Sequence, residues 1–179
     1  MSAMKMLQLA GLTPAQIQKL DVLGYWSAPA SKGHHLAVPG GLVEHSVNVT
    51  ARLVELSTAW GVKWPRPESP YLVGMLHDLV KTKCYKLMPD CGAKAAYEFI
   101  LKENLKHGLS SKFAAEYSLG VRFEQAEEDA IVYHMGPWNL GKDYDREELD
   151  RAIRRSGPFI VATYGADWYA ASVDEGGEP

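Results

Sequence analysis

Hydrophobic residues recur along most of this chain every three or four positions, which is the spacing of one face of an α-helix. The first helix is predicted over 13–25, where Thr13 is a suitable N-cap for the apolar stripe that follows. Glycines and prolines crowd 27–41, so this stretch is expected to be a loop. The helical spacing returns over 42–60 and places His45 on the apolar face of that helix.

The next hydrophobic stretch, 71–83, is apolar on nearly every side, as expected of a helix buried in a core. Its polar exceptions are His77, Asp78 and Lys81, which share one narrow face because they lie three, four and seven positions beyond the same glycine. Burying these groups without partners would cost several kcal/mol. The fold must therefore supply partners for them.

The rest of the chain predicts a single all-α domain. Residues 84–101 are ambiguous between hairpin and helix, and the turn signal at 89–92 favours a small β-hairpin inserted in the helical body. Further helices are predicted over 110–119, 124–134, 145–154 and 158–172. We expect one domain over 1–173, with its core over 41–172 and an acidic tail over 174–179.

Composition is that of an ordinary globular protein, since 46% of the 179 residues are hydrophobic and 23% are charged. The net charge is −3 and no basic block is present, so duplex nucleic acid is not an expected partner. No apolar run approaches the roughly 18 residues that cross a bilayer, and we expect a cytoplasmic protein without a membrane partner. Cys84 and Cys91 are too few for a disulfide framework or a thiolate zinc site.

The histidines and two aspartates suggest a metal site. A single inward histidine is usually a satisfied core residue, and a single inward aspartate is usually a cap or an ion-pair partner. Inward polar groups on five separate segments are much harder to assign to chance, and a metal ion would satisfy them together. The segments carry His45, the pair His77 and Asp78, His107, His134 and Asp167.

The order of these residues resembles the HD-domain superfamily of metal-dependent phosphohydrolases. Its most specific parts are Gly-Gly-Leu-Val-Glu-His-Ser at 40–46, preceded by His35, and Leu-His-Asp-Leu-Val-Lys at 76–81. The similarity spans 27–172 and is strongest to small stand-alone HD proteins of bacteria and their phages. The chain is also similar to the catalytic domain of HD-type three-prime exoribonucleases, but it has no room for their nucleic-acid-binding domain. Met135 stands where members with a third metal site have histidine.

This resemblance implies an all-α HD-domain helical bundle in which one metal ion is held by His45, His77, Asp78 and Asp167. A second ion would be bridged by Asp78 and completed by His107 and His134. Imidazole and carboxylate ligands suit Mn²⁺, Fe²⁺, Ni²⁺, Co²⁺ or Zn²⁺, with Mg²⁺ an alternative at the second position. One or two divalent ions are therefore expected per chain.

The expected catalytic residues are Lys81, His35 and Asp78. Lys81 lies one turn beyond the His-Asp pair and is placed either to neutralise a phosphate oxygen or to pair with Asp78. His34 and His35 precede the glycine turn, and the resemblance favours His35 as part of a phosphate-binding wall. The role of His34 stays open.

The leading functional prediction is a phosphohydrolase that cleaves a small phosphorylated substrate, a nucleotide or a short nucleic-acid end, with hydroxide supplied at the metal. Tyr25, Trp26 and Trp138 are candidates to stack a base, although aromatic residues beside helix ends are more often core residues. An HD-fold mixed-valent di-iron oxygenase is the alternative, because the resemblance gives it the same ligands. A third interpretation is a binding protein with a structural metal. The substrate, the native metal and the oligomeric state stay open.

Overall fold

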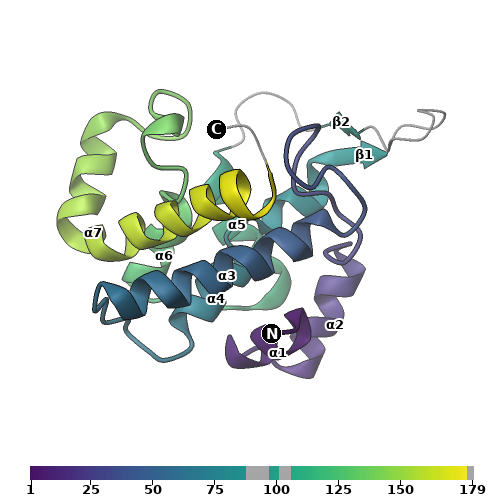
Figure 1. The fold of residues 1–179 in the computed structure, drawn as a ribbon, viewed down its shortest axis with the longest axis horizontal. Coiled ribbons are helices and arrows are strands. Elements are labelled where there is room, and N and C mark those ends of the chain that lie inside the picture. Colours follow the sequence, from purple (N-terminus) through teal and green to yellow (C-terminus); the bar gives the residue numbers. More distant parts are fainter. Residues whose placement is uncertain (88–96, 101–105, 177–179) are drawn as a thin grey trace.

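The computed structural model describes residues 1–87, 97–100 and 106–176, and the predicted all-α fold class is confirmed there (Figure 1). None of the described helices combines the length and the apolar character that crossing a membrane requires. The helices are α1 (Ala3–Leu9), α2 (Pro14–Val22), α3 (Gly41–Ala59), α4 (Ser69–Leu76), α5 (His107–Ala114), α6 (Gln125–Val132) and α7 (Arg146–Tyr169). The described residues also form four shorter helical turns: η1 (Leu79–Lys83), η2 (Ala115–Leu119), η3 (Gly136–Asn139) and η4 (Ala170–Asp174).

The long helix α3 lies at the centre, and the second half of α7 lies beside it (Figure 1). One hydrophobic cluster joins α1, α2 and α4 to the start of α3 through residues such as Leu20 and Leu42. A second cluster joins α6 and α7 to the middle of α3 through residues such as Leu53 and Ile131. Because a fully buried leucine stabilises a fold by about 1.5–3 kcal/mol, both clusters fix α3 firmly in place.

Helix α4 packs against α3 at Gly74, where a Cβ atom would come within 2.4 Å of Thr50 Oγ1. The sequence predicts one helix over 71–83, and that prediction is wrong in one respect. The α-helix ends at Leu76, Asp78 leaves the helical conformation (φ −110°, ψ 17°), and a 3₁₀ turn follows. Because of this break, His77 and Asp78 lie just beyond the end of α4 and do not share one face of a continuous helix.

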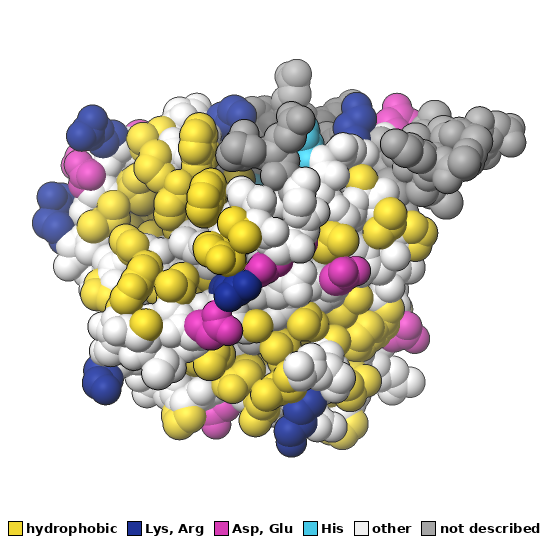
Figure 2. All heavy atoms as spheres, in the orientation of Figure 1, with side chains coloured by type: hydrophobic (Ala, Val, Ile, Leu, Met, Phe, Trp, Pro, Cys, Tyr) yellow, Lys and Arg dark blue, Asp and Glu magenta, His cyan; other side chains and the backbone are white. Residues whose placement is uncertain are grey.

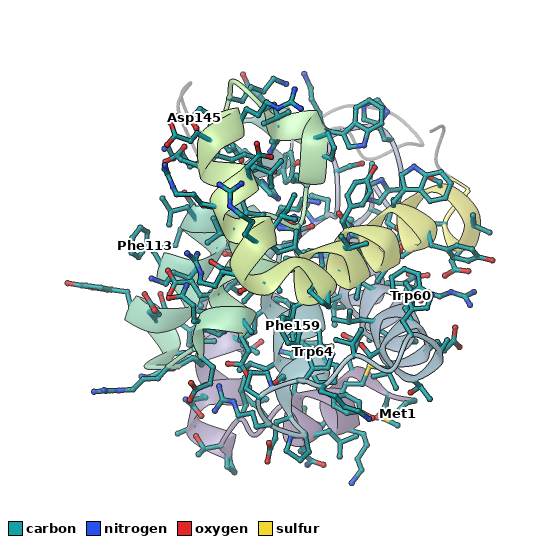
Figure 3. All side chains as sticks on the ribbon, turned by 90° about the vertical axis from the view of Figure 1, so that its left-hand side faces the viewer. Met1, Trp60, Trp64, Phe113, Asp145 and Phe159 are labelled. Carbon is teal, nitrogen blue, oxygen red and sulfur yellow. The ribbon has the colours of Figure 1, made fainter. Side chains whose placement is uncertain are left out.

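Helix α7 bends near its middle, where Ser156 departs from helical geometry (φ −134°). Asp129 of α6 holds the bend, because it accepts hydrogen bonds from Arg155 Nε at 2.8 Å and Ser156 Oγ at 2.6 Å. Beside the bend, the rings of Phe159 and Trp64 lie 5.0 Å apart (Figure 3). The two helices predicted for this region are thus joined through a kink, and the second half lies beside α3.

The strands β1 (Tyr85–Leu87) and β2 (Tyr97–Phe99) pair antiparallel, in agreement with the hairpin expected within 84–101. The predicted turn at 89–92 lies outside the described residues, as does Cys91. Cys84, directly before β1, has a free buried thiol. Burial raises the pKa of this thiol to about 12, so it stays protonated at neutral pH.

The N-terminal region holds one more helix than the sequence predicts, because α1 is only seven residues long and shows no clear period. Thr13 caps α2 as predicted, with its side chain accepting a hydrogen bond from the backbone N–H of Gln16. The predicted helix over 13–25 ends earlier, at Val22. Gly24 adopts a left-handed conformation (φ 81°) that stops it.

Candidate metal centre

Four side chains from α3, the end of α4 and α7 converge on one point. His45 Nε2 lies 3.0 Å from Asp167 Oδ1 and 3.5 Å from Asp78 Oδ2. His77 Nε2 lies 3.4 Å from the same Asp78 oxygen and 3.7 Å from the same Asp167 oxygen. Ligand atoms about 2.1 Å from a shared ion lie roughly 3.0–3.4 Å from one another, so these separations are close to those of one coordination sphere.

Asp78 connects this group to a second one. Its Oδ2 atom faces His45 and His77, while its Oδ1 atom lies 2.5 Å from His107 Nε2 and 3.6 Å from His134 Nε2. His107 is the first residue of α5, and His134 follows the end of α6. The structure therefore brings together all six residues that the sequence predicts as ligands, and one carboxylate lies between two sets of imidazoles.

The buried imidazoles are oriented by bonds on their far side. His77 Nδ1 donates to the carbonyl oxygen of Gly74 at 2.9 Å, and His134 Nδ1 donates to that of Ile131 at 2.7 Å. A carbonyl oxygen can only accept, so each Nδ1 atom carries the hydrogen. In the neutral imidazole, the Nε2 atom then presents its lone pair to the aspartates.

Several Nε2 atoms of the site are buried without a partner. The Nε2 atoms of His45, His77 and His134 have no hydrogen-bond partner within the described residues, and the same holds for His35 Nε2. Leaving one such group unsatisfied costs about 1–3 kcal/mol. Binding of metal at the cluster would use these lone pairs together with the carboxylates, so the residues present fit a metal ion.

A further carboxylate that the sequence analysis assigned to the acidic tail also reaches this centre. Glu175 accepts hydrogen bonds from His45 Nδ1 at 3.0 Å and from Asn48 Nδ2 at 3.0 Å. Next to it, Asp174 receives two hydrogen bonds from Arg52, at 2.6 and 2.8 Å. One face of α3 carries three polar residues spaced by three and four positions, namely His45, Asn48 and Arg52. This polar stripe is the feature of the sequence that could have indicated a polar partner for α3.

Both aspartates of the centre are ionised. Burial alone would raise the pKa of Asp78, but the charges of Lys81, His77 and His107 outweigh it and hold that pKa well below its usual range. Burial would likewise raise the pKa of Asp167, and the imidazoles of His45 and His77 hold it well below its usual range. Charged carboxylates are the form that binds cations.

Lys81 and His35 lie at the edge of the centre. Lys81 Nζ is 2.5 Å from Asp78 Oδ2 and is largely buried. His35 stands over His45, with ring centroids 5.0 Å apart. Burial, together with the neighbouring His45 and Lys81, lowers the pKa of His35 to about 4, so this imidazole is neutral at pH 7.

A cleft of about 450 Å³ opens onto the two aspartates. Its lining combines charged and aromatic side chains: His34, His35, Asp78, Lys81, Met135, Trp138, Tyr164, Asp167, Trp168, Ala171 and Ser172. Of the three aromatic residues expected at the mouth, only Trp138 is there. Tyr25 is fully buried and donates to the carbonyl oxygen of Met75, while Trp26 lines a separate groove beside α1 and α2.

No family model, no curated protein and no solved structure matches this chain. The functional interpretation of this chain therefore rests on the geometry of its histidine and aspartate cluster. The chain is a helical protein with a buried cluster of histidines and aspartates that could hold a metal ion.

Proposed function

We propose that this chain is a metal-dependent phosphohydrolase of the HD-domain type. The observation that carries the proposal is the position of Asp78, whose two oxygens face two separate pairs of imidazoles. A purely structural site needs about four ligands around one ion and no shared carboxylate. An arrangement built around a shared carboxylate is instead suited to two adjacent cations.

The charges of the centre also favour this function. Asp78, Asp167 and Glu175 carry three negative charges, and Lys81 returns one positive charge. One divalent cation would balance the remainder, and a second would leave the centre positive. An anionic phosphate ester would then be attracted to it.

The donor set suits Mn²⁺, Fe²⁺, Co²⁺, Ni²⁺ or Zn²⁺ at the group formed by His45, His77, Asp78 and Asp167. His107 and His134 would complete a second group, where Mg²⁺ is an alternative. When bound, such ions supply positive charge at phosphoryl oxygens and a water molecule acidic enough to ionise near pH 7.

The chain's own residues would bind and orient the substrate. Lys81 lines the cleft beside Asp78, so its ammonium group can approach a non-bridging phosphate oxygen and stabilise the charge that develops there. His35 is neutral and can offer one N–H donor to the same phosphate. A nucleotide or a short nucleic-acid end would fit this cleft.

The proposal is tested by loading the purified protein separately with each candidate metal and measuring phosphate release. The substrates are nucleoside mono- and triphosphates, cyclic nucleotides and short single strands. In ¹⁸O-labelled water the label is expected in the phosphate product. Oxygen consumption without phosphate chemistry would reject the hydrolase and support the di-iron oxygenase.

A variant pair sharpens this test. Lys81→Met is expected to lower turnover by about one to three powers of ten while the protein keeps its metal, because one charge at the phosphate is lost. Lys83→Met is the matched control, since Lys83 lies on the same 3₁₀ turn but is exposed and outside the cleft. Equal turnover in the two variants would remove Lys81 from the proposed chemistry.

A further inference from the structure

The cleft has two chemically different walls. Asp78, Lys81 and Asp167 form the charged wall, where a phosphate would lie. Trp138, Tyr164 and Trp168 line the same cavity and form its aromatic wall. A ligand that fills the cleft must therefore join an anionic group to an apolar one.

The aromatic wall is held in place by specific contacts. Trp138 Nε1 donates a hydrogen bond to Tyr164 Oη at 3.0 Å, which links η3 to α7. Gly136 has a positive φ of 54° and lies so close to the Tyr164 ring that a Cβ atom would come within 2.8 Å of it. Tyr144 Oη donates to the carbonyl oxygen of Gly136 at 2.6 Å. These contacts hold the Trp138 and Tyr164 parts of the wall in place.

The wall is nevertheless open to solvent. Trp138 is 67% exposed and Trp168 is 44% exposed. Hydrophobic side chains also gather on the face of the molecule over the second half of α7 (Figure 2). Exposed aromatic surface that continues into a charged cleft is typical of a ligand site.

We propose that this wall, formed by Trp138, Tyr164 and Trp168, stacks the base of a nucleoside phosphate. The proposal rests on the function proposed above and names its substrate class. A flat aromatic base suits indole and phenol rings better than a bare sugar does, because stacking uses the whole face of each ring. A cavity of about 450 Å³ is the size of a small-molecule site. Stacking contacts the flat face of a base and not the hydrogen-bonding groups on its edge, so the site should accept several different bases.

The test compares adenosine 5′-monophosphate with ribose 5-phosphate, which has the same phosphate and sugar but no base. Binding is measured by isothermal titration of the full chain with Mn²⁺ present, and KM is measured where turnover occurs. The wild-type protein should bind the nucleotide at least tenfold more tightly than the sugar phosphate. Trp138→Ala should remove most of that difference, whereas Trp138→Phe should keep most of it because an aromatic face remains.

Trp60→Ala is the matched control, because Trp60 is 54% exposed at the end of α3 and does not line the cleft (Figure 3). It should leave both affinities unchanged. The proposal is overturned if wild-type protein does not distinguish the two ligands, or if Trp138→Ala weakens both equally. The titration needs no turnover, so a failed stacking proposal is distinguishable from a failed hydrolase proposal: each can fail while the other stands.

Discussion

At the scale of single residues, the direction of each imidazole decides what the centre can bind. His77 and His134 use Nδ1 for a backbone carbonyl, and His45 uses Nδ1 for Glu175. All three Nε2 atoms therefore face the aspartates. In the absence of a metal, a proton on Nε2 can supply positive charge to these carboxylates, in addition to the ammonium group of Lys81 beside Asp78.

This competition between proton and metal predicts a pH dependence. Burial alone would lower the pKa of His77, but the charges of Asp78 and Asp167 outweigh it and raise that pKa to about 10. At pH 8 the metal-free centre should hold a proton on His77, and metal binding should release it. Titration of Mn²⁺ in buffers of different ionisation enthalpy should show this release. The affinity should rise with pH up to about 10, and an affinity that is flat between pH 7 and 9 would contradict the assignment.

The same shift affects the stability of the metal-free protein. A pKa raised above its unfolded value of 6.5 stabilises the fold fully below pH 6.5, and that stabilisation is lost as the pH rises through about 10. Chemical unfolding of the chelated protein should therefore show a falling free energy of unfolding between pH 7 and pH 10. The metal-loaded protein should lose much less.

Glu175 gives a second prediction at this scale. Glu175→Ala removes the acceptor of His45 Nδ1, so the imidazole is no longer held in one tautomer, and metal affinity should fall about 10–100-fold. Glu175→Gln keeps a carbonyl acceptor and should lose less. Glu55→Gln is the control, because Glu55 is exposed and contacts only the neighbouring Arg52 among the hydrogen bonds described for it. Similar metal affinities in the alanine variant and wild type would exclude an orienting role for Glu175.

The helical period of the sequence predicts that His45 and Asp167 point inward, whereas the grouping of all six ligands into two sets came from the resemblance to HD domains. Glu175 was missed because it follows the last periodic segment and lies 130 positions from His45. A contact over that separation depends on how α7 packs beside α3, which no local pattern encodes. The Nδ1 partners of His77 and His134 could not be predicted either, because they are backbone carbonyl oxygens, which every residue provides.

At the scale of elements, close helix contacts set the distances within the centre. Gly108 in the first turn of α5 lies against the last turn of α6, and a Cβ atom there would come within 2.3 Å of the Val132 carbonyl oxygen. This contact fixes His107 beside His134, with ring centroids 5.3 Å apart.

Gly108→Ala should push α5 away from α6 and destabilise the protein by about 1–3 kcal/mol. The second metal should be lost while the first is retained, because His45 and His77 lie on other helices. Gly165→Ala is the control, since its Cβ would make an ordinary 3.5 Å contact with Leu56. Loss of both metals, or of neither, would argue against two separate groups around Asp78.

The elements differ in how far sequence could predict them. Helix α3 is long and strongly periodic, and its predicted range of 42–60 nearly matches Gly41–Ala59. The predicted 71–83 helix instead breaks at Asp78, because tertiary contacts at the cluster override a locally helical pattern. That break is what allows His77 and Asp78 to face the same group of ligands.

At the scale of the whole molecule, the proposed ligands connect helices from both halves of the chain. His45 lies near the start of α3 and Asp167 near the end of α7. An ion bound by both would join these helices, so it would stabilise the folded chain and not the unfolded one.

Chelation should therefore lower the melting temperature. An ion present at a hundred times its dissociation constant adds about 2.7 kcal/mol, which corresponds to roughly 5–10 °C for a chain of this length. Differential scanning fluorimetry with and without chelator measures this shift. Asp78→Ala, which removes the shared carboxylate, should show no shift, and a shift of equal size in that variant would place the stabilising ion elsewhere.

Anomalous diffraction from crystals grown with Zn²⁺ or Mn²⁺ would locate the bound ions. An anomalous peak is expected about 2.0–2.3 Å from the Nε2 atoms of His45 and His77 and from oxygens of Asp78 and Asp167. A second peak is predicted between Asp78, His107 and His134. Crystals that show metal only on the surface, or none at the histidine and aspartate cluster, would contradict the proposed metal centre.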